Sequence, residues 1–213
     1  MPPLNMLPTI KELQYYPEQH RYRYKGDWLL NNVSSVIGYF IDEASMAFIE
    51  KYREGPKGWE KRGKDIHAYT DDFLQKKNPK DLPDWEDWTK AIREQNFFKG
   101  SILFATEYAL CDEERSLGGS FDFLLQDQEG RTLLGDLKTC SSLKAAKSRK
   151  PATEQLGAYA SMIKLHHPEV VIDKCCTVVS GPKLCRVIEQ EVDECIEKWE
   201  ETWLEYDILN NDF

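Results

Sequence analysis

The sequence lacks any long apolar run. No window of its 213 residues approaches the roughly 18 to 20 consecutive apolar residues that a membrane-spanning helix requires. The amino-terminal segment also lacks the basic stretch followed by an apolar one that marks a secretory signal, and no arginine precedes Arg21. These absences argue against a membrane partner and against a targeting segment. We therefore expect a soluble intracellular protein.

Cysteine is present, but without the short paired spacings of zinc-binding motifs. We expect reduced thiols at the 6 cysteines, which stand at positions 111, 140, 175, 176, 185 and 195. Cys175, Cys176 and Cys185 resemble only part of an iron–sulfur pattern. A zinc module that combined them with His166 and His167 would have poor ligand spacing, and it stays open as an alternative.

Positive charge is scarce. The chain has 28 Lys and Arg against 37 Asp and Glu, which gives a net charge of −9. This balance argues against a protein that coats nucleic acid non-specifically, because such binding depends on neutralising phosphates. It does not exclude an enzyme that acts on a polyanion, since active-site carboxylates add negative charge and local clustering of basic residues decides binding.

Apolar side chains are plentiful enough for a substantial core. Hydrophobic residues make up 41% of the chain and aromatic residues 12%, including 6 Trp. No internal repeat or low-complexity tract divides the sequence, so we expect residues 1–213 to form a single domain. Helical patterns come first, followed by three short strands, a helix, further strands and a closing helix. That order predicts an α/β fold.

The amino-terminal part, from about residue 30 to 100, has mostly helical patterns. Residues 20–30 precede it and alternate aromatic and polar side chains around a Lys25-Gly26-Asp27 turn, which predicts a hairpin. Three helices are then expected, over 34–52, about 59–74 and about 85–98. The first begins with serines suited to capping and is ended by Gly55-Pro56.

The character of the chain changes near residue 101. Three β-favouring segments separated by turns predict a meander over 102–110, 119–127 and 131–139. The meander and the helix expected after it occupy about 101–165. A basic loop joins the two, and the remaining expected elements are a helix over 153–164, strands within 170–180 and 185–190, and a closing helix whose core stripe is Val192, Ile196, Trp199 and Trp203.

The Asp136-Leu137-Lys138 tripeptide is the sharpest chemical feature of the sequence. Residues two apart in a strand point to the same face, so a carboxylate and an ammonium stand side by side. Such a pair can hold a hard divalent cation and assist water in attacking a phosphodiester. The tripeptide alone is common, and an exposed ion pair is the ordinary alternative. The preceding strand places Asp122 among apolar residues, where its charge is costly unless a shared metal compensates it.

Two further residues are candidates for the same site. Glu107 occupies the strand before Asp122 and is either a surface carboxylate of an edge strand or a group that supports the metal. His67 lies at the edge of the apolar stripe of the second helix. A lone histidine in that position is usually a hydrogen-bonded structural residue.

The stretch from Leu137 to Thr153 has no Asp or Glu and forms a local basic patch of Lys138, Lys144, Lys147, Arg149 and Lys150. It can contact phosphates beside a metal site, or it can be an ordinary solvated loop. In the helix that follows, Gln155 and Tyr159 are four residues apart and share one face. They are either a surface amide with a half-buried ring, or an amide and a ring directed at the site.

Taken in order, these features resemble the RecB-like branch of the PD-(D/E)xK nucleases. Single elements are weak, but five in the expected order and spacing cover about residues 60 to 160. They are Gly63-Lys64-Asp65-Ile66-His67, Thr106-Glu107, Gly119-Ser120-Phe121-Asp122, Gly135-Asp136-Leu137-Lys138-Thr139 and Gln155-x-x-x-Tyr159. Within this branch the chain looks most like single-domain exonucleases similar to mitochondrial genome maintenance exonuclease and to phage-encoded recombination nucleases.

The resemblance implies a set of metal ligands. His67, Asp122 and Asp136 would bind Mg²⁺ or Mn²⁺, with the carbonyl of Leu137 as a further ligand. The Asp at 136 stands where this superfamily often has Glu, and both occur. Related nucleases associated with CRISPR systems hold an iron–sulfur cluster through an amino-terminal Cys that is absent here, so we expect no cluster.

The resemblance also implies roles for the other candidates. Lys138 would serve the attacking water, and Glu107 would support the metal or the substrate. Gln155 and Tyr159 would complete the site around the scissile phosphate. Further contacts to substrate phosphates would come from the basic patch, through Lys144, Lys147 and Arg149.

The implied fold is a restriction-endonuclease-like core, with a mixed central sheet flanked by helices and a helical amino-terminal half. The implied activity is metal-dependent hydrolysis of DNA from single-stranded or frayed ends, in recombination, repair or replication. The expected location is the cytoplasm of a bacterial or phage-infected cell. A structure-specific or restriction-type endonuclease and a catalytically silent DNA-binding domain are the alternatives.

Overall fold

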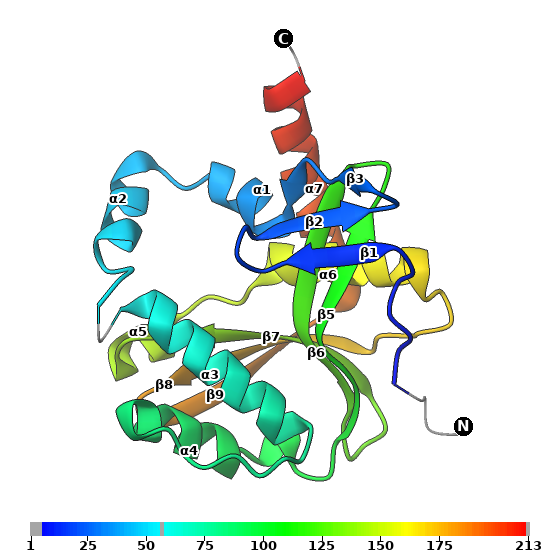
Figure 1. Cartoon of the computed structure of the whole chain (residues 1–213). Helices are drawn as coiled ribbons and strands as arrows, with labels where there is room; N and C mark the ends of the chain where they lie inside the picture. Colours follow the sequence, from blue (N-terminus) through cyan, green and yellow to red (C-terminus); the bar gives the residue numbers. More distant parts are fainter. Residues whose placement is uncertain (1–5, 56–57, 212–213) are drawn as a thin grey trace.

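A mixed β-sheet with helices on both faces organises the chain, in a computed structural model that describes residues 6–55 and 58–211 (Figure 1). The α/β class expected from the sequence is therefore confirmed. The predicted stop at Gly55-Pro56 falls partly on Pro56, which lies outside the described residues. No helix in the described ranges is long and apolar enough to cross a membrane.

The predicted meander forms one side of the sheet, with β5 at its edge. Strands β5, β6 and β7 pair antiparallel in sequence, β7 and β8 pair parallel, and β8 and β9 pair antiparallel. A short strand, β4, adds parallel to the start of β6. The bounds are Asn31–Asn32 for β4, Ile102–Asp112 for β5, Leu117–Gln126 for β6, Thr132–Thr139 for β7, Lys174–Gly181 for β8 and Leu184–Gln190 for β9.

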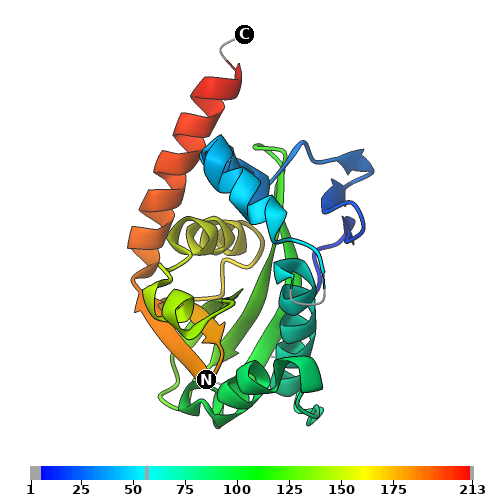
Figure 2. The same ribbon diagram turned by 90° about the vertical axis from the view of Figure 1, so that its left-hand side faces the viewer.

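Apolar residues of the central strands fill two core layers, one on each face of the sheet. Helices α6 and α7 lie over one face, and α3 and α4 over the other (Figure 2). The expected stripe of the closing helix packs inward, with Trp199 only 1% exposed. The bounds are Trp59–Leu74 for α3, Glu86–Glu94 for α4, Thr153–His166 for α6 and Val192–Asn211 for α7.

The predicted amino-terminal hairpin is confirmed and extended. Strands β2, Arg21–Tyr24, and β3, Asp27–Trp28, pair around Lys25 and Gly26, which both have positive φ, at 50° and 94°. A further strand, β1, Leu13–Tyr16, pairs with β2. The sequence analysis missed β1, because Pro and Glu in the turn that follows gave no standard two-residue hairpin signal.

The single helix expected over 34–52 is wrong in detail. It is split into α1, Val33–Tyr39, and α2, Glu43–Lys51. Asp42 separates them because its carboxylate accepts a hydrogen bond from the Ser45 amide at 2.9 Å and so caps a new helix.

The predicted boundaries elsewhere need smaller corrections. The cap of α1 is Asn32, and Ser35 completes a capping box with it instead of starting the helix. The helix expected near 85–98 is α4 flanked by single 3-10 turns, η1 over Pro83–Trp85 and η2 over Asn96–Phe98. The basic loop after β7 contains a short helix, α5, Leu143–Ser148.

Candidate metal centre

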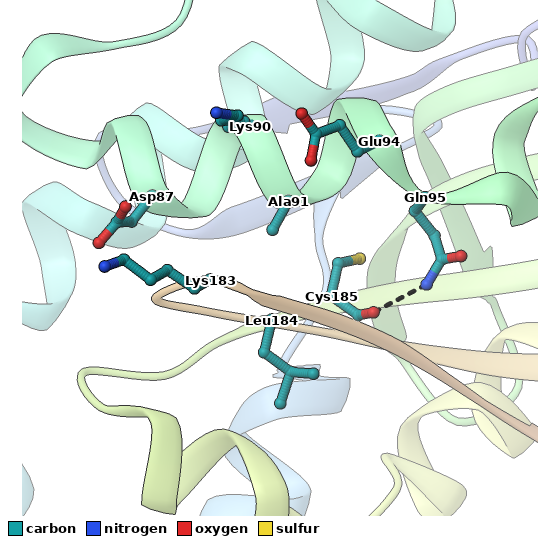
Figure 3. A pocket seen from close by; sticks show the side chains of 8 residues that line it. All are labelled: Asp87, Lys90, Ala91, Glu94, Gln95, Lys183, Leu184 and Cys185. Carbon is teal, nitrogen blue, oxygen red and sulfur yellow. Dashed lines mark hydrogen bonds between the residues drawn. The ribbon is translucent and has the colours of Figure 1, made fainter.

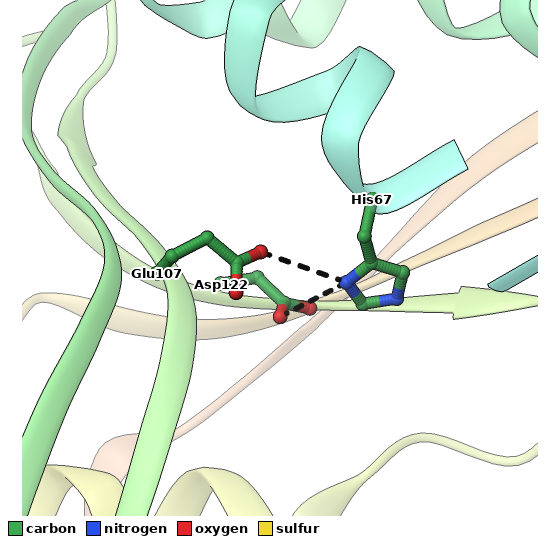
Figure 4. A group of neighbouring side chains, drawn as sticks. All are labelled: His67, Glu107 and Asp122. Carbon is green, nitrogen blue, oxygen red and sulfur yellow. Dashed lines mark ion pairs between the residues drawn. The ribbon is translucent and has the colours of Figure 1, made fainter. Parts of the chain in front are cut away.

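Three side chains from three elements converge on one face of the sheet: His67 from α3, Glu107 from β5 and Asp122 from β6 (Figure 4). Nδ1 of His67 lies 3.2 Å from a carboxylate oxygen of Asp122 and 3.8 Å from one of Glu107. Among the described His, Cys, Asp and Glu residues, these three form the group whose potential metal-ligand atoms all lie within 4.8 Å of one another.

The end of the β6–β7 ladder positions Asp122. Pairing between the two strands runs from Gln126 and Thr132 to Phe123 and Gly135 and then stops. Beyond that point the carboxylate of Asp122 accepts a hydrogen bond from the backbone amide of Leu137. Because the amide and carbonyl of one residue in an extended strand face the same edge, the Leu137 carbonyl is also directed toward β6.

Glu107 holds an unusual backbone conformation inside a strand. Its neighbours Thr106 and Tyr108 pair with Phe123 and Phe121, so Glu107 stands opposite Asp122. Its φ is 45°, in the left-handed region that is unfavourable for a residue with a side chain. Strain of this kind persists only where the surrounding structure imposes it, and it is frequent at functional sites.

A second group of predicted site residues is connected through Lys138. Asp136 is almost fully buried, and its Oδ2 lies 2.8 Å from Nζ of Lys138 but accepts no hydrogen bond of acceptable geometry. Lys138 donates to Oε1 of Gln155 at 2.7 Å, and the Gln155 amide donates to the hydroxyl of Tyr159 at 2.8 Å. Four predicted site residues therefore form one connected polar chain.

The two groups influence each other electrostatically. Burial opposes the charge of His67, but the carboxylates of Asp122 and Glu107 outweigh it and hold the pKa of His67 well above its ordinary value of 6.5. Burial likewise opposes the charge of Asp122, and His67 outweighs it, so the pKa of Asp122 is lowered. Burial raises the pKa of Asp136, only partly offset by Lys138, with Asp122 adding to the rise.

A cavity of about 330 Å³, here called the central cavity, opens onto these side chains. Part of its lining was not predicted from the sequence, because it comes from the amino-terminal hairpin through Tyr15, His20 and Tyr22. The hydroxyl of Tyr22 is hydrogen-bonded to that of Ser120 at 3.0 Å, which fixes the hairpin over β6. The predicted residues that line the cavity are His67, Glu107, Asp122, Gln155 and Tyr159.

The structure does not bring the basic patch into the central cavity. Lys144 and Lys147 are exposed on α5, and Arg149 is exposed just after it. None of the three lines the cavity. Their predicted contacts to substrate phosphates would therefore lie outside it, beyond the end of β7.

A larger cavity of about 410 Å³ lies elsewhere, between α4 and the turn that joins β8 to β9 (Figure 3). Its lysines, Lys90 and Lys183, are matched by Asp87 and Glu94. Burial raises the pKa of the Cys185 thiol there to about 12, so this cysteine is a poor nucleophile. The lining offers neither a convergent ligand set nor an activated group.

The zinc alternative finds no support in residues 6–55 and 58–211. Its histidines and cysteines do not gather at one point there. His166 instead donates a hydrogen bond to the carbonyl of Cys111 at 2.7 Å, and His167 is hydrogen-bonded to the hydroxyl of Tyr108 at 2.8 Å.

The residues at the central cavity fit a hard divalent cation. Carboxylate oxygens with one imidazole are ligands that Mg²⁺ and Mn²⁺ accept. The 4.8 Å limit on their separations is slightly wider than the roughly 4.2 Å across an octahedral Mg²⁺ site, so small side-chain rotations would close it. The unsatisfied buried oxygen of Asp136 is a second indication that a partner belongs here.

Comparisons with known proteins add little to this picture. No protein-family model matches the chain, and no curated protein matches it. A solved structure titled "Crystal structure of SSO0001" is similar over 82% of this chain and 75% of its own, with 14% sequence identity and a TM-score of 0.42. A similarity at this level assigns neither a family nor a function to the chain.

Proposed function

We propose that this protein is a metal-dependent deoxyribonuclease of the PD-(D/E)xK type. The observation that carries the proposal is that His67, Glu107 and Asp122 lie close together, and that Asp122 and His67 interact electrostatically with the buried Asp136, which pairs with Lys138. Carboxylates that share a site with a lysine and an imidazole suit hydrolysis of a phosphodiester, where negative charge must be bound and water activated.

His67, Asp122 and Glu107 would hold the cation, with Asp136 and the Leu137 carbonyl as the additional ligands predicted from the sequence. A bound Mg²⁺ or Mn²⁺ supplies Lewis acidity toward a phosphoryl oxygen and makes water more acidic. Asp122 can take part without losing its place, because one of its oxygens is already fixed by the Leu137 amide.

The ammonium of Lys138 lies close to two side-chain oxygen atoms. Asp136 lies on one side of it at 2.8 Å and the Gln155 carbonyl on the other at 2.7 Å. Because one ammonium hydrogen is donated to Gln155, another would remain to orient the attacking water or to stabilise charge on the phosphate. Gln155 is in turn fixed by Tyr159, so both act as positioning residues for Lys138.

DNA as the substrate and attack from an end are proposals that rest on the family resemblance. The central cavity is near the lower limit of small-molecule pockets, about 300 to 1,000 Å³, which suits a single splayed nucleotide better than an intact duplex. Tyr15 is 39% exposed at the cavity and offers a ring on which a base can stack.

Time courses on DNA labelled at the 5′ or the 3′ end test this proposal. Single- and double-stranded substrates are incubated with Mg²⁺, Mn²⁺ or chelator, and we expect metal-dependent release of label that starts at an end. Closed circular single strands separate the exonuclease from the endonuclease alternative, because an enzyme that requires an end leaves the circle intact. DNA binding without hydrolysis under every metal condition would favour the silent DNA-binding domain.

A further inference from the structure

The small sheet of β1, β2 and β3 has two faces of different character. Figure 1 shows this sheet lying across β5 and β6. Because side chains alternate along a strand and paired residues share a face, the register assigns each residue to one face. Tyr15 and Tyr22 belong to the inner face, which covers the central cavity. The opposite face, here called the outer face, consists of Gln14, Tyr16, Arg21, Arg23 and Trp28.

The outer face carries positive charge that its own side chains do not neutralise. Arg21 and Arg23 are exposed, and no acidic residue belongs to this face, whose strands lie wholly in the described part of the chain. Among the described residues the side chain of Arg21 has only a ring contact, and Arg23 adds one hydrogen bond, to the carbonyl of Gly26 at 2.6 Å. Most N–H donors of both guanidiniums are therefore available to an external anion.

The indole of Trp28 holds these cations in one cluster. The guanidinium carbon of Arg21 lies 4.5 Å from the centre of the Trp28 ring, and that of Arg23 lies 6.0 Å from it. The ring centres of Tyr16 and Trp28 are 4.9 Å apart. Trp28 nevertheless stays 38% exposed. Guanidiniums that already rest on a ring lose less freedom when a ligand binds, so the outer face is preorganised.

Cations interleaved with aromatic rings on an open face suit single-stranded nucleic acid. Arginine donors reach phosphate oxygens, and an exposed ring or guanidinium plane can stack on an unpaired base. A duplex hides the faces of its bases, so it would use the cations alone. An acidic peptide would likewise leave the rings unused. The combination of charges and rings therefore favours a single strand over both.

The outer face begins beside the central cavity. His20 lies in the turn between β1 and β2, lines the cavity and directly precedes Arg21. Arg21 pairs with Tyr16 at the end of the ladder next to this turn. A ligand that occupies both places must bend around the turn. Double-stranded DNA, with a persistence length of about 50 nm, resists so sharp a bend, whereas a single strand does not.

We propose that the outer face binds single-stranded nucleic acid through Arg21, Arg23 and Trp28, and that the bound strand continues over the β1–β2 turn into the central cavity. The second clause rests on the proposed function. The arginines contact phosphates, and the exposed part of Trp28 stacks on a base. The outer face then holds the substrate strand away from the scissile phosphate and selects single strands over duplex.

Binding of a labelled oligothymidylate of about 12 nucleotides, in chelator, tests the outer face without hydrolysis. Arg21→Met keeps the aliphatic part of the side chain over Trp28 and removes the charge. It should lower the slope of log affinity against log salt by about 0.7, the value for one phosphate contact on a single strand. Trp28→Leu should weaken binding by at least about 5-fold, the effect of losing one base stack.

Lys90→Met is the matched control for the loss of one positive charge. Lys90 is exposed on α4, which packs against β8 and β9, at the opposite edge of the sheet from β5. It should keep the native affinity and salt dependence. Arg21 is exposed and makes no hydrogen bond among the described residues, so its variant stays informative even if Trp28→Leu fails to fold. Native affinity and salt slope in every folded variant, as expected if the face bound an acidic protein instead, would overturn the proposal.

The same oligothymidylate annealed to oligodeoxyadenylate separates single strand from duplex. The wild type should bind the single strand more tightly, and Trp28→Leu should weaken only that binding. Equal losses on both ligands would show that the face takes any phosphate backbone and that the single-strand assignment is wrong. Hydrolysis with native affinity in Arg21→Met and Trp28→Leu removes this inference alone. Binding through the outer face without hydrolysis of any DNA removes the proposed function alone, so the two failures are distinguishable.

Discussion

At the scale of single residues, the two carboxylate oxygens of Asp122 make different contacts. One carboxylate oxygen accepts the Leu137 amide, and the other lies 3.2 Å from His67. Asp122→Asn can keep the bond to the amide while it loses the negative charge. We expect this variant to bind Mn²⁺ at least about 10-fold more weakly. The melting temperature of the metal-free protein should change only by what the loss of the ion pair with His67 costs. Titration with Mn²⁺ measures this, and native affinity would remove Asp122 from the ligand set.

The protonation of His67 gives a prediction about pH. Its pKa is raised by Asp122 and Glu107, so its contribution to stability is complete below its ordinary value of 6.5 and is lost as pH rises through the higher folded-state value. A metal needs the neutral imidazole, so metal affinity should increase with pH across that window and binding should release a proton.

Titration of the His67 ring signals by NMR, in the absence of metal, checks the direction of the shift. Calorimetry in two buffers of different ionisation enthalpy counts the released proton. A pKa of His67 at or below 6.5, together with no proton released on metal binding between that pH and neutrality, would contradict the assignment of His67 as a metal ligand.

Some site residues were predictable from local sequence and others were not. Asp136 and Lys138 followed from the period of two in a strand, and Asp122 from the cost of a charge among apolar neighbours. The contact of Glu107 with His67 depends on a left-handed backbone within β5, which no local pattern announces.

At the scale of elements, the left-handed residue in β5 can be tested through stability. Replacing Glu107 by Ala removes the carboxylate and keeps the strain, whereas replacing it by Gly removes both. We expect Glu107→Gly to exceed Glu107→Ala in unfolding free energy by about 1 kcal/mol, measured by denaturant unfolding. An alanine variant as stable as the glycine variant would mean that the backbone is not strained at this position.

The close approach of α6 to α7 gives a second prediction at this scale. A Cβ at Gly157 would lie 1.9 Å from the backbone carbonyl oxygen of Cys195, so Gly157→Ala forces the two helices apart. We expect a loss of about 1 to 3 kcal/mol in unfolding free energy. Gly38→Ala is the control, because nothing lies within 4 Å of a Cβ there and alanine favours the helix. Equal effects from the two variants would contradict the packing described.

The predicted elements were most accurate where a pattern was long or strictly alternating. The boundaries of α3 and the three strands of the meander agree with the structure because apolar periodicity and turns coincide there. The break between α1 and α2 was missed because an Asp42 cap competes locally with a continuous helical pattern. Helix α5 was missed because a short basic segment forms a helix here only through its packing on β8, where Ala146 is buried.

At the scale of the whole molecule, the sheet brings together residues that are far apart in the chain. Cores on both faces hold the strands, and Gly119, Ser120 and Asp122 of β6 line the central cavity. The hairpin of β1 and β2 covers this site through Tyr15 and Tyr22. Periodicity predicts neither this covering nor the separation of the basic patch from the cavity, because both depend on contacts distant in sequence.

The charges behind the net value of −9 are unevenly distributed over the molecule. Glu107 and Asp122 line the central cavity, whereas Arg149 and Lys150 line a different cavity beside Cys140. The chain thus concentrates acidic side chains at one cavity and basic side chains at another, and the basic one can attract a polyanion despite the negative net charge.

The rate of DNA hydrolysis by the wild type and by Lys138→Gln, with Mg²⁺ and with chelator, tests the central claim most directly. Glutamine is neutral and can still donate a hydrogen bond to Gln155, so the fold and the positioning chain are kept. We expect metal-dependent hydrolysis by the wild type, none in chelator, and a rate reduced by at least about 100-fold in the variant. A variant that hydrolyses DNA at the native rate, or a folded wild type with no metal-dependent hydrolysis of any DNA substrate, would contradict the account.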